Sequence, residues 1–292
     1  MARRTDEGSA DSDRTGTDAS GGVALGPVAE TLLIPLYGRA EIVRRGERLV
    51  ADPRAVELVE AIDYDFARFD GLPSLVGAAW RTAVFDHWVE AWLDRHPAGT
   101  VVEIGVGLNT RYERIAAGRG RWIELDLPDA MALRRRYFAD DERRRSVAAS
   151  VLDDDWLDLA ADTRPGPWLF VAEAVLGFLD ADEVHGVLDR IARRLPGSTV
   201  AFDSWGAWMR ENQEEHDALS RVTARVRWFC DNPADLAGPV HGFDLVESVR
   251  LTEAPLAVLE RLPADVAAGL STLRTEPQVL SYRLNLATVG AA

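Results

Sequence analysis

Hydrophobic and polar positions follow two different patterns on either side of about residue 98. Over 23–97, apolar residues recur at helical spacing in two runs, which are Leu32, Leu36, Ala40 and Val43, then Trp80, Val84, Trp88 and Trp92. Between these runs, Asp52-Pro53 is typical of a helix start. We therefore predict an N-terminal helical cap over 23–97.

After residue 98, short apolar runs alternate with helical segments. The runs that predict strands lie at 100–105, 121–126, 146–150, 168–172, 199–203, 243–249 and 278–289. The clearest helix covers 181–195, where Asp180 and Glu183 form a capping box. Another helix is predicted over 206–229. The alternation predicts an α/β core over 98–292 with a Rossmann-like, mixed but mostly parallel seven-stranded sheet and a helical insertion at about 205–240.

Composition and charge limit the partners. The 292-residue chain has a net charge of −15, which disfavours contact with nucleic acid or anionic membranes. No apolar stretch is long enough to span a membrane, and the polar segment 1–22 predicts a disordered tail rather than a signal peptide. The single cysteine, Cys230, allows no internal disulfide. We expect a cytoplasmic protein, monomer or homodimer, that acts on a small molecule.

The segment EIGVGLNT at 103–110 points to a ligand site. A predicted strand leads into a turn containing Gly105 and Gly107, and glycines allow a sharp turn and close approach of a ligand to the backbone. Asp126 ends the next predicted strand, 19 residues after Gly107, a spacing at which a carboxylate can bind ribose hydroxyls. Together, the turn and the acid predict a nucleoside cofactor.

Two nucleoside cofactors fit this pattern, NAD and S-adenosylmethionine. NAD sites usually have a third glycine, where this chain has Thr110, and they place a pyrophosphate at the helix N-terminus. The acidic Glu103 beside the turn would repel phosphates but suits a sulfonium and an amino group. These residues favour S-adenosylmethionine, with S-adenosylhomocysteine as its product.

Five segments carry a family resemblance. They are TLLIPLYGRA with the following DPRA at 31–55, WRTAVFD at 80–86, VVEIGVGLNTR at 101–111, WIELDLPDAMALRR at 122–135 and VAEAVLGFL at 171–179. In order and spacing they resemble the leucine carboxyl methyltransferase superfamily, and within it the bacterial polyketide carboxyl O-methyltransferases of the tetracenomycin type. The resemblance spans about residues 30–250 and implies a class I methyltransferase fold.

The resemblance also implies roles for single residues. Arg81 is implied to hold the methionyl carboxylate, with Arg39 as a second basic group nearby. Glu173 is implied to lie near the methionyl amino group and is our first catalytic candidate. The other implied cofactor-binding residues are Glu103, Gly105, Gly107, Asp126, Leu127, Ser150 and Val151. The chain departs from the family pattern at Val106, Asn109 and Phe178, the last of which replaces a common tyrosine.

Two acceptors for the methyl group remain open. A carboxylate is ionised at pH 7 and needs no base, but once buried it needs a partner, for which the insertion offers Arg210, Arg225 and Arg227. A phenol has a pKa near 10 and needs a base, for which His216 is a weak catalytic candidate. Further candidate substrate contacts are Phe178, Trp205 and Trp208.

A third hypothesis is a cofactor-binding homologue without catalysis. Asn109 and Phe178 support it, whereas Arg81, Asp126 and Glu173 argue against it. No spacing of histidine, cysteine and acidic residues resembles a metal site, so we predict no metal.

Overall fold

The structure is a computed structural model that describes residue 26, residues 30–162 and residues 166–291. The tail predicted at 1–22 lies outside the described residues. Within them, none of the helices is long and apolar enough to cross a membrane.

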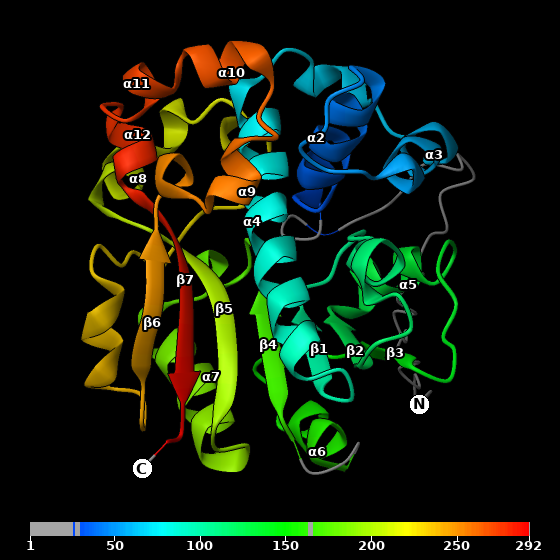
Figure 1. The fold of residues 1–292 in the computed structure, drawn as a ribbon, viewed down its shortest axis with the longest axis vertical. Helices are drawn as coiled ribbons and strands as arrows, with labels where there is room; N and C mark the ends of the chain where they lie inside the picture. Colours follow the sequence, from blue (N-terminus) through cyan, green and yellow to red (C-terminus); the bar gives the residue numbers. More distant parts are fainter. Residues whose placement is uncertain (1–25, 27–29, 163–165, 292) are drawn as a thin grey trace, which may run out of the picture.

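The described residues form one sheet of seven strands, in the order β3-β2-β1-β4-β5-β7-β6 (Figure 1). The strands are β1 (Thr100–Ile104), β2 (Arg121–Asp126), β3 (Arg144–Ala148), β4 (Trp168–Ala172), β5 (Ser198–Trp205), β6 (Asp244–Val249) and β7 (Tyr282–Val289). Strands β1 to β5 run parallel, whereas β7 pairs antiparallel with both β5 and β6. The predicted mixed, mostly parallel sheet is therefore confirmed.

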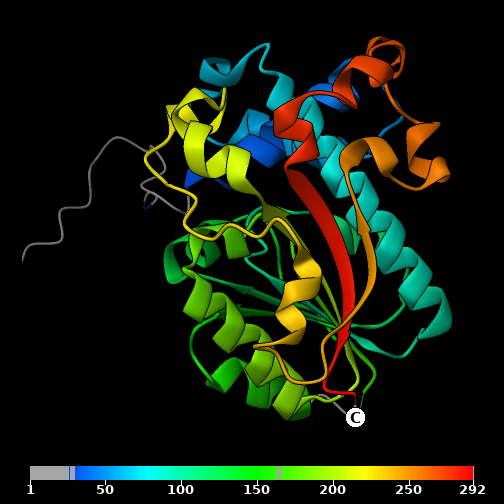
Figure 2. The same cartoon turned by 90° about the vertical axis from the view of Figure 1, so that its left-hand side faces the viewer.

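Helices cover both faces of the sheet, because alternate side chains of each strand point to opposite sides. Along β1, Val102 lies in a core cluster with α6 (Asp155–Asp162) and α7 (Ala181–Arg194). Val101, one residue earlier, packs in a second cluster with α4 (Pro73–Arg95). Figure 2 shows α4 on one side of the sheet and α7 on the other. Helix α7 begins with the predicted capping box.

A layer of short helices covers the edge where the parallel strands end (Figure 1). We call residues 30–72, 206–222 and 251–281 of this layer the roof. Its helices are α2 (Leu33–Arg44), α3 (Pro53–Ala61), α8 (Ala207–Asn212), α9 (Leu256–Leu259), α10 (Ala264–Ala268), α11 (Leu270–Leu273) and α12 (Pro277–Leu280). The remaining helix, α5 (Pro128–Arg134), follows β2. The helices between β6 and β7 were not predicted from the sequence.

Short helical turns complete the chain. They are η1 (Phe66–Phe69), η2 (Tyr112–Ala116), η3 (Leu176–Phe178), η4 (Gln213–Glu215), η5 (Leu219–Arg221), η6 (Pro233–Ala237) and η7 (Leu251–Glu253). The glycine turn is followed only by the short η2. It ends at Ala117, which has a left-handed backbone conformation with φ of 48°.

Two strands lie a few residues away from their predicted positions. Strand β3 covers 144–148 instead of 146–150, because its buried positions are the polar Arg144 and Ser146. The guanidinium of Arg144 lies over the ring of Tyr112, 4.5 Å from its centroid. Because this buried residue is charged, an apolar pattern could not reveal that the strand begins at Arg144. The last strand begins at Tyr282 instead of residue 278, because Pro277 begins α12, where a proline is favoured.

The long helix predicted over 206–229 is wrong. Helix α8 ends at Asn212, and residues 222–228 form no helix; their buried residues stand at alternate positions: Val222, Ala224, Val226 and Trp228. The amide of Arg227 donates to the carbonyl of Gly177 in η3 at 2.7 Å. The apolar period of two residues in this segment indicates extended chain, and the helical spacing of Val222 and Val226 was misleading.

Helix α4 lies within the predicted cap of 23–97, yet it packs against both the roof and the sheet. Leu75 in its first turn belongs to the cluster of α2 and α3, whereas Trp88 and Trp92 pack against the sheet. A single helix therefore connects the roof to the core.

Candidate active site

A cavity of about 990 Å³ lies between the strand ends and the roof. Its volume is at the upper end of the range for small-molecule sites, about 300–1,000 Å³, so it has room for two ligands. Most of the predicted site residues line it: Arg39, Arg81, Glu103, Gly105, Gly107, Asp126, Leu127, Ser150, Val151, Glu173, Phe178, Trp205 and His216. Trp208, Arg210, Arg225 and Arg227 are not among its lining residues.

The glycine turn is held open by its backbone conformation. Gly105 has φ of 62° and Gly107 has φ of 51°, in the left-handed region that favours glycine. A Cβ on Gly105 would lie 2.4 Å from a methyl carbon of Val175, so a side chain would also clash there. The turn therefore presents bare backbone to the cavity.

Asp126 connects this turn to the end of β2. Its Oδ2 accepts the amide of Gly107 at 2.6 Å, and its Oδ1 accepts the amide of Leu127 at 2.7 Å. Burial raises the pKa of Asp126, although these two amides oppose the rise. A carboxylate can accept about four hydrogen bonds, so capacity remains for ribose hydroxyls.

Buried arginines hold the carbonyl groups of the turn. Arg134 donates to the carbonyls of Gly107 at 3.0 Å and Asn109 at 2.8 Å. Arg39 donates to the carbonyl of Leu108 and to Asp52, both at 2.8 Å. These contacts make Arg39 a support of the turn, and its predicted contact with the methionyl carboxylate stays a prediction.

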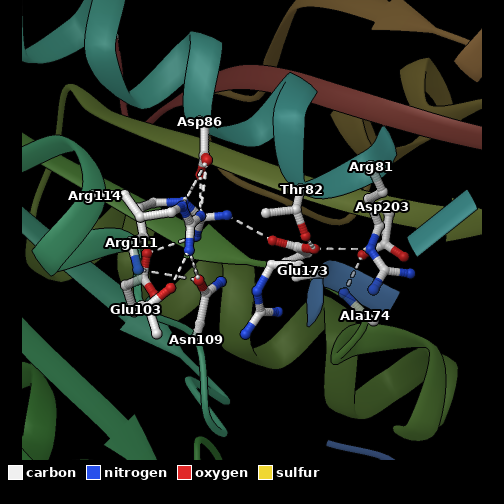
Figure 3. Close-up of polar contacts among 12 residues, drawn as sticks. Arg81, Thr82, Asp86, Glu103, Asn109, Arg111, Arg114, Glu173, Ala174 and Asp203 are labelled. Carbon is white, nitrogen blue, oxygen red and sulfur yellow. Dashed lines mark hydrogen bonds and ion pairs between the residues drawn. The ribbon is translucent and has the colours of Figure 1, made fainter. Parts of the chain in front are cut away.

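Arg111 is the centre of a buried ionic network under the cavity (Figure 3). Its side chain is only 1% exposed, and its three nitrogens donate to three carboxylates, those of Asp86 at 2.7 Å and of Glu103 and Glu173 at 2.6 Å. Arg114 donates to Asp86 as well, at 2.8 Å. Glu103 is therefore paired with Arg111, and the idea that it offers a free negative charge to a sulfonium is not supported.

Glu173 follows β4 and binds three partners. Its Oε1 accepts from Arg81 at 3.0 Å and from the Thr82 hydroxyl at 2.7 Å, while Oε2 accepts from Arg111 (Figure 3). Burial alone would raise the pKa of Glu173, but the charges of Arg81 and Arg111 outweigh it and lower the pKa to about 2. Such a carboxylate is a poor proton acceptor at neutral pH, so its geometry suits binding and positioning.

Asp203 and Tyr282 extend the network toward the roof. The Tyr282 hydroxyl donates to Asp203, and Arg81 lies 3.4 Å from the same hydroxyl. Asp203 also accepts the amide of Ala174 at 2.6 Å (Figure 3). Ala174 has φ of 57°, a conformation uncommon for a residue with a side chain, so Asp203 holds a strained turn beside Glu173.

The predicted substrate residues fall into two groups. The rings of Trp205 and Tyr282 are tilted by 37° with centroids 4.2 Å apart, and Trp205 and Phe178 both line the cavity. Arg225 and Arg227 instead occupy the exposed positions of the extended segment, where they pair with Glu214 and Asp180. Arg210 is exposed on α8. The prediction that these arginines contact substrate is therefore not supported, because the segment is extended and turns them outward.

Sequence reasoning assigned no role to Arg111, Arg134, Asp203 or Tyr282. Arg111 and Arg134 stand within the motif segments at 101–111 and 122–135, so an arginine directly after a glycine turn was a signal that could have been used. Tyr282 offered no such signal, because it reaches the site through the pairing of β7 with β5.

The model of the leucine carboxyl methyltransferase family matches residues 33–192 of this chain. The chain belongs to this family. The matched range includes the glycine turn, Asp126, Arg111 and Glu173, so the network in Figure 3 lies mostly within the family region.

Two curated relatives agree with this membership, and one solved structure has the same fold. The chain is 31% identical to the tetracenomycin polyketide synthesis O-methyltransferase TcmP of Streptomyces glaucescens, over 90% of this chain and 97% of the relative. It is 29% identical to the S-adenosyl-L-methionine-dependent methyltransferase dpfgK of Gibberella zeae, over 76% of this chain and 82% of the relative. A protein from Thermobifida fusca, assigned as a methyltransferase, has the same fold, with a TM-score of 0.59, 16% identity, and coverage of 94% and 97%.

This leucine carboxyl methyltransferase homologue is thus an enzyme that uses S-adenosylmethionine, and the hypothesis of a non-catalytic homologue is not supported. The cavity fits this cofactor. The bare turn at Gly105 and Gly107 allows close approach, and both oxygens of Asp126 keep hydrogen-bonding capacity. Cationic Arg81 lies at the same cavity, where it suits the methionyl carboxylate.

Proposed function

We propose that this enzyme transfers a methyl group to a carboxylate of a small, largely apolar, polyketide-like molecule. The cofactor contacts belong to the proposal: Arg81 and Arg39 at the methionyl carboxylate, Glu173 near the amino group, Glu103, Gly105 and Gly107 beside the turn, Asp126 and Leu127 at the ribose, and Ser150 and Val151 at the adenine.

One observation carries the choice of a carboxylate: none of the three candidate bases beside the strand ends and the roof, Glu103, Glu173 and His216, is ready to remove a proton. Glu103 and Glu173 are paired with Arg111. Of the five histidines, only His216 lines the cavity, and its Nδ1 accepts the amides of Ala218 and Leu219. A carboxylate acceptor is already ionised at neutral pH and needs no base.

The charge balance of this transfer agrees with such a site. When bound, S-adenosylmethionine supplies a methyl group on a sulfonium; the acceptor oxygen forms the new O–CH₃ bond as the S–CH₃ bond breaks. An anion and a cation thereby become a neutral ester and a neutral thioether, and no proton moves. The chain's own residues bind and orient the two reactants and exclude water from them.

The lining of the cavity supports an apolar acceptor. Aromatic surface is provided by four lining residues, Trp80, Phe178, Trp205 and Tyr282. The relative from Streptomyces glaucescens is named for tetracenomycin polyketide synthesis, which agrees with a polyketide-like acceptor.

A phenol acceptor is the second candidate, because His216 lies at the cavity and could serve as a base if its ring carried the proton on Nδ1. The two acceptors make opposite predictions for pH dependence. Transfer to a carboxylate should be independent of pH from about 6 to 9, whereas transfer to a phenol should rise as the base loses its proton.

The test compares 2-naphthoate with 2-naphthol, two flat probes that differ in the oxygen group. Purified enzyme is given S-adenosylmethionine and either probe, and methylated product is measured by mass spectrometry over this pH range. We expect the methyl ester of 2-naphthoate at a rate independent of pH. Methylation of 2-naphthol alone, or of neither probe by protein that binds S-adenosylhomocysteine in calorimetry, would contradict the proposal.

A further inference from the structure

His216 is a buried residue of the roof that faces the cavity. It follows η4, its side chain is 7% exposed, and its ring meets the edge of Trp205 with centroids 5.7 Å apart. None of the other four histidines lines this cavity. The tautomer and charge of the His216 ring therefore decide whether it can donate a hydrogen bond to the methyl acceptor or remove a proton from it.

Neighbouring residues fix the position of His216. The carboxylate of Asp217 accepts both the amide of Ser74, at 3.0 Å, and the Ser74 hydroxyl. Ser74 lies in the first turn of α4, where a carboxylate satisfies free amides of the helix end. The carbonyl of His216 also accepts the amide of Ser220 at 3.0 Å. The segment is thus tied to the longest helix of the described fold.

The hydrogen bonds of the ring favour one tautomer. The amides of Ala218, at 3.3 Å, and Leu219, at 3.2 Å, both donate to Nδ1. A nitrogen that accepts hydrogen bonds carries no proton, so the neutral ring carries its proton on Nε2. Burial lowers the pKa of His216, which keeps the ring neutral at pH 7.

Asp217 is the one nearby group that would favour the opposite tautomer. Its Oδ1 lies 3.3 Å from Nδ1, and a proton on Nδ1 could be attracted to it. However, this oxygen already accepts the Ala218 amide at 2.9 Å and the Ser74 hydroxyl. A proton on Nδ1 would also meet two backbone amides that point at the same atom, which is repulsive.

The other ring nitrogen is available to a ligand. Nε2 has no hydrogen-bond partner among the described residues, yet it is not one of their fully enclosed unpaired atoms, so it keeps access to solvent. The side chain lines the cavity, so the cavity is the space in which a ligand could meet this nitrogen.

We propose that His216 donates its Nε2–H to an oxygen of the acceptor and so selects and orients a carboxylate, rather than removing a proton from a hydroxyl. This inference rests on the proposed transfer to a carboxylate. A desolvated carboxylate needs a donor for the oxygen that does not attack. The arginines of the 206–230 segment are exposed and do not line the cavity, so within this segment His216 is the side chain that we propose as the donor.

The first test measures the tautomer without any substrate. Protein with ¹⁵N-labelled histidine is examined by NMR, and the His216→Gln variant identifies the His216 signals. We expect a proton on Nε2 and an unprotonated Nδ1, and a change of the Nε2–H signal when 2-naphthoate is added to protein saturated with S-adenosylhomocysteine. A proton on Nδ1, or a signal that 2-naphthoate leaves unchanged, would overturn the inference.

The second test separates a donor from a base. Glutamine keeps an N–H donor near the position of Nε2 but cannot act as a base, whereas alanine removes both functions. We expect His216→Ala to lower kcat/KM for 2-naphthoate about 10- to 100-fold, as for a hydrogen bond to a charged group, and His216→Gln to retain most of it. Equal losses in both variants would overturn the donor role.

Two controls keep this outcome separate from that of the proposed function. His241→Gln changes an exposed histidine that does not line the cavity and should behave as wild type. Binding of S-adenosylhomocysteine should be unchanged in every variant. If wild-type enzyme methylates 2-naphthol instead, the proposed function fails, while the NMR measurement still reports the tautomer.

Discussion

The two sides of the cavity are built by different chemistry. The side that we call the floor consists of the glycine turn, Asp126 and the residues of the Arg111 network, and it is held by buried ion pairs and charged hydrogen bonds. The roof is held mainly by apolar packing of short helices, in a cluster that includes Leu33, Phe69 and Val222. Directional contacts therefore set the position of each polar group of the floor, whereas apolar packing sets only the overall shape of the roof.

This difference matches the tasks of the two sides. A cofactor that is the same in every turnover can be bound by preorganised polar groups, so no free energy is spent on reorganising them. An acceptor is recognised through shape and a few polar contacts. Substitutions in the floor should therefore have large effects on stability and cofactor binding, and substitutions on the outer side of the 206–230 segment should have small ones.

The largest effect is expected for Arg111→Met. The variant leaves Asp86, Glu103 and Glu173 buried without the guanidinium that each of them binds. Removing one partner of a buried ion pair typically costs about 3–5 kcal/mol, so the free energy of unfolding should fall by at least that amount. Urea unfolding followed by circular dichroism measures it.

Arg193→Met is the matched control for this prediction. Arg193 pairs with Asp189 on the exposed side of α7, and such a surface pair contributes little. Its free energy of unfolding should equal that of the wild type within error. If Arg111→Met unfolded at the same urea concentration as Arg193→Met, the network would not support the floor.

A smaller effect, confined to cofactor binding, is expected for Asp126→Asn. Asparagine replaces one of the two accepting oxygens by an NH2 donor, so one of the Gly107 and Leu127 amides loses its acceptor and the ribose hydroxyls lose a charged acceptor. Loss of charged hydrogen bonds should weaken binding of S-adenosylhomocysteine about 10- to 100-fold in calorimetry. Asp182→Asn, at an exposed position of α7, should bind as wild type. Equal affinities of the two variants would contradict a ribose contact.

The smallest effect is expected for Arg227→Ala. The guanidinium is about half exposed and pairs with Asp180 at the surface. Neither unfolding, cofactor affinity nor turnover of 2-naphthoate should differ measurably from the wild type. A clear loss of turnover with unchanged cofactor affinity would indicate that Arg227 contacts the substrate after all. It would also weaken the contrast between the floor and the outer surface.

The glycine turn and Asp126 of the floor were predictable because they belong to a local sequence pattern. Gly105, Gly107 and Asp126 lie at the ends of two adjacent parallel strands, and the pattern that predicts the strands also predicts that these ends meet. Arg111 was overlooked because spacing alone does not distinguish a surface arginine from one that binds three buried carboxylates.

The roof was predicted less well for a physical reason. Its short helices have too few turns to produce a clear apolar period, as in α9 and α11, which have four residues each. The alternating segment around Val222 and Val226 fits both a helical and an extended period over a few residues. In the structure, pairing of the Arg227 amide with Gly177 decides for the extended form.

The sequence by itself determined the α/β core, the glycine turn with its strand-end acid, and S-adenosylmethionine as the cofactor, because periodicity and motif spacing are properties of neighbouring residues. Only the tertiary structure decided which charged side chains are ion-paired and which face the cavity. It paired Glu103 and Glu173 with Arg111, brought Tyr282 to Arg81, and turned Arg225 and Arg227 away from the cavity. The ionic partners of a residue depend on contacts between distant segments, which no local pattern records.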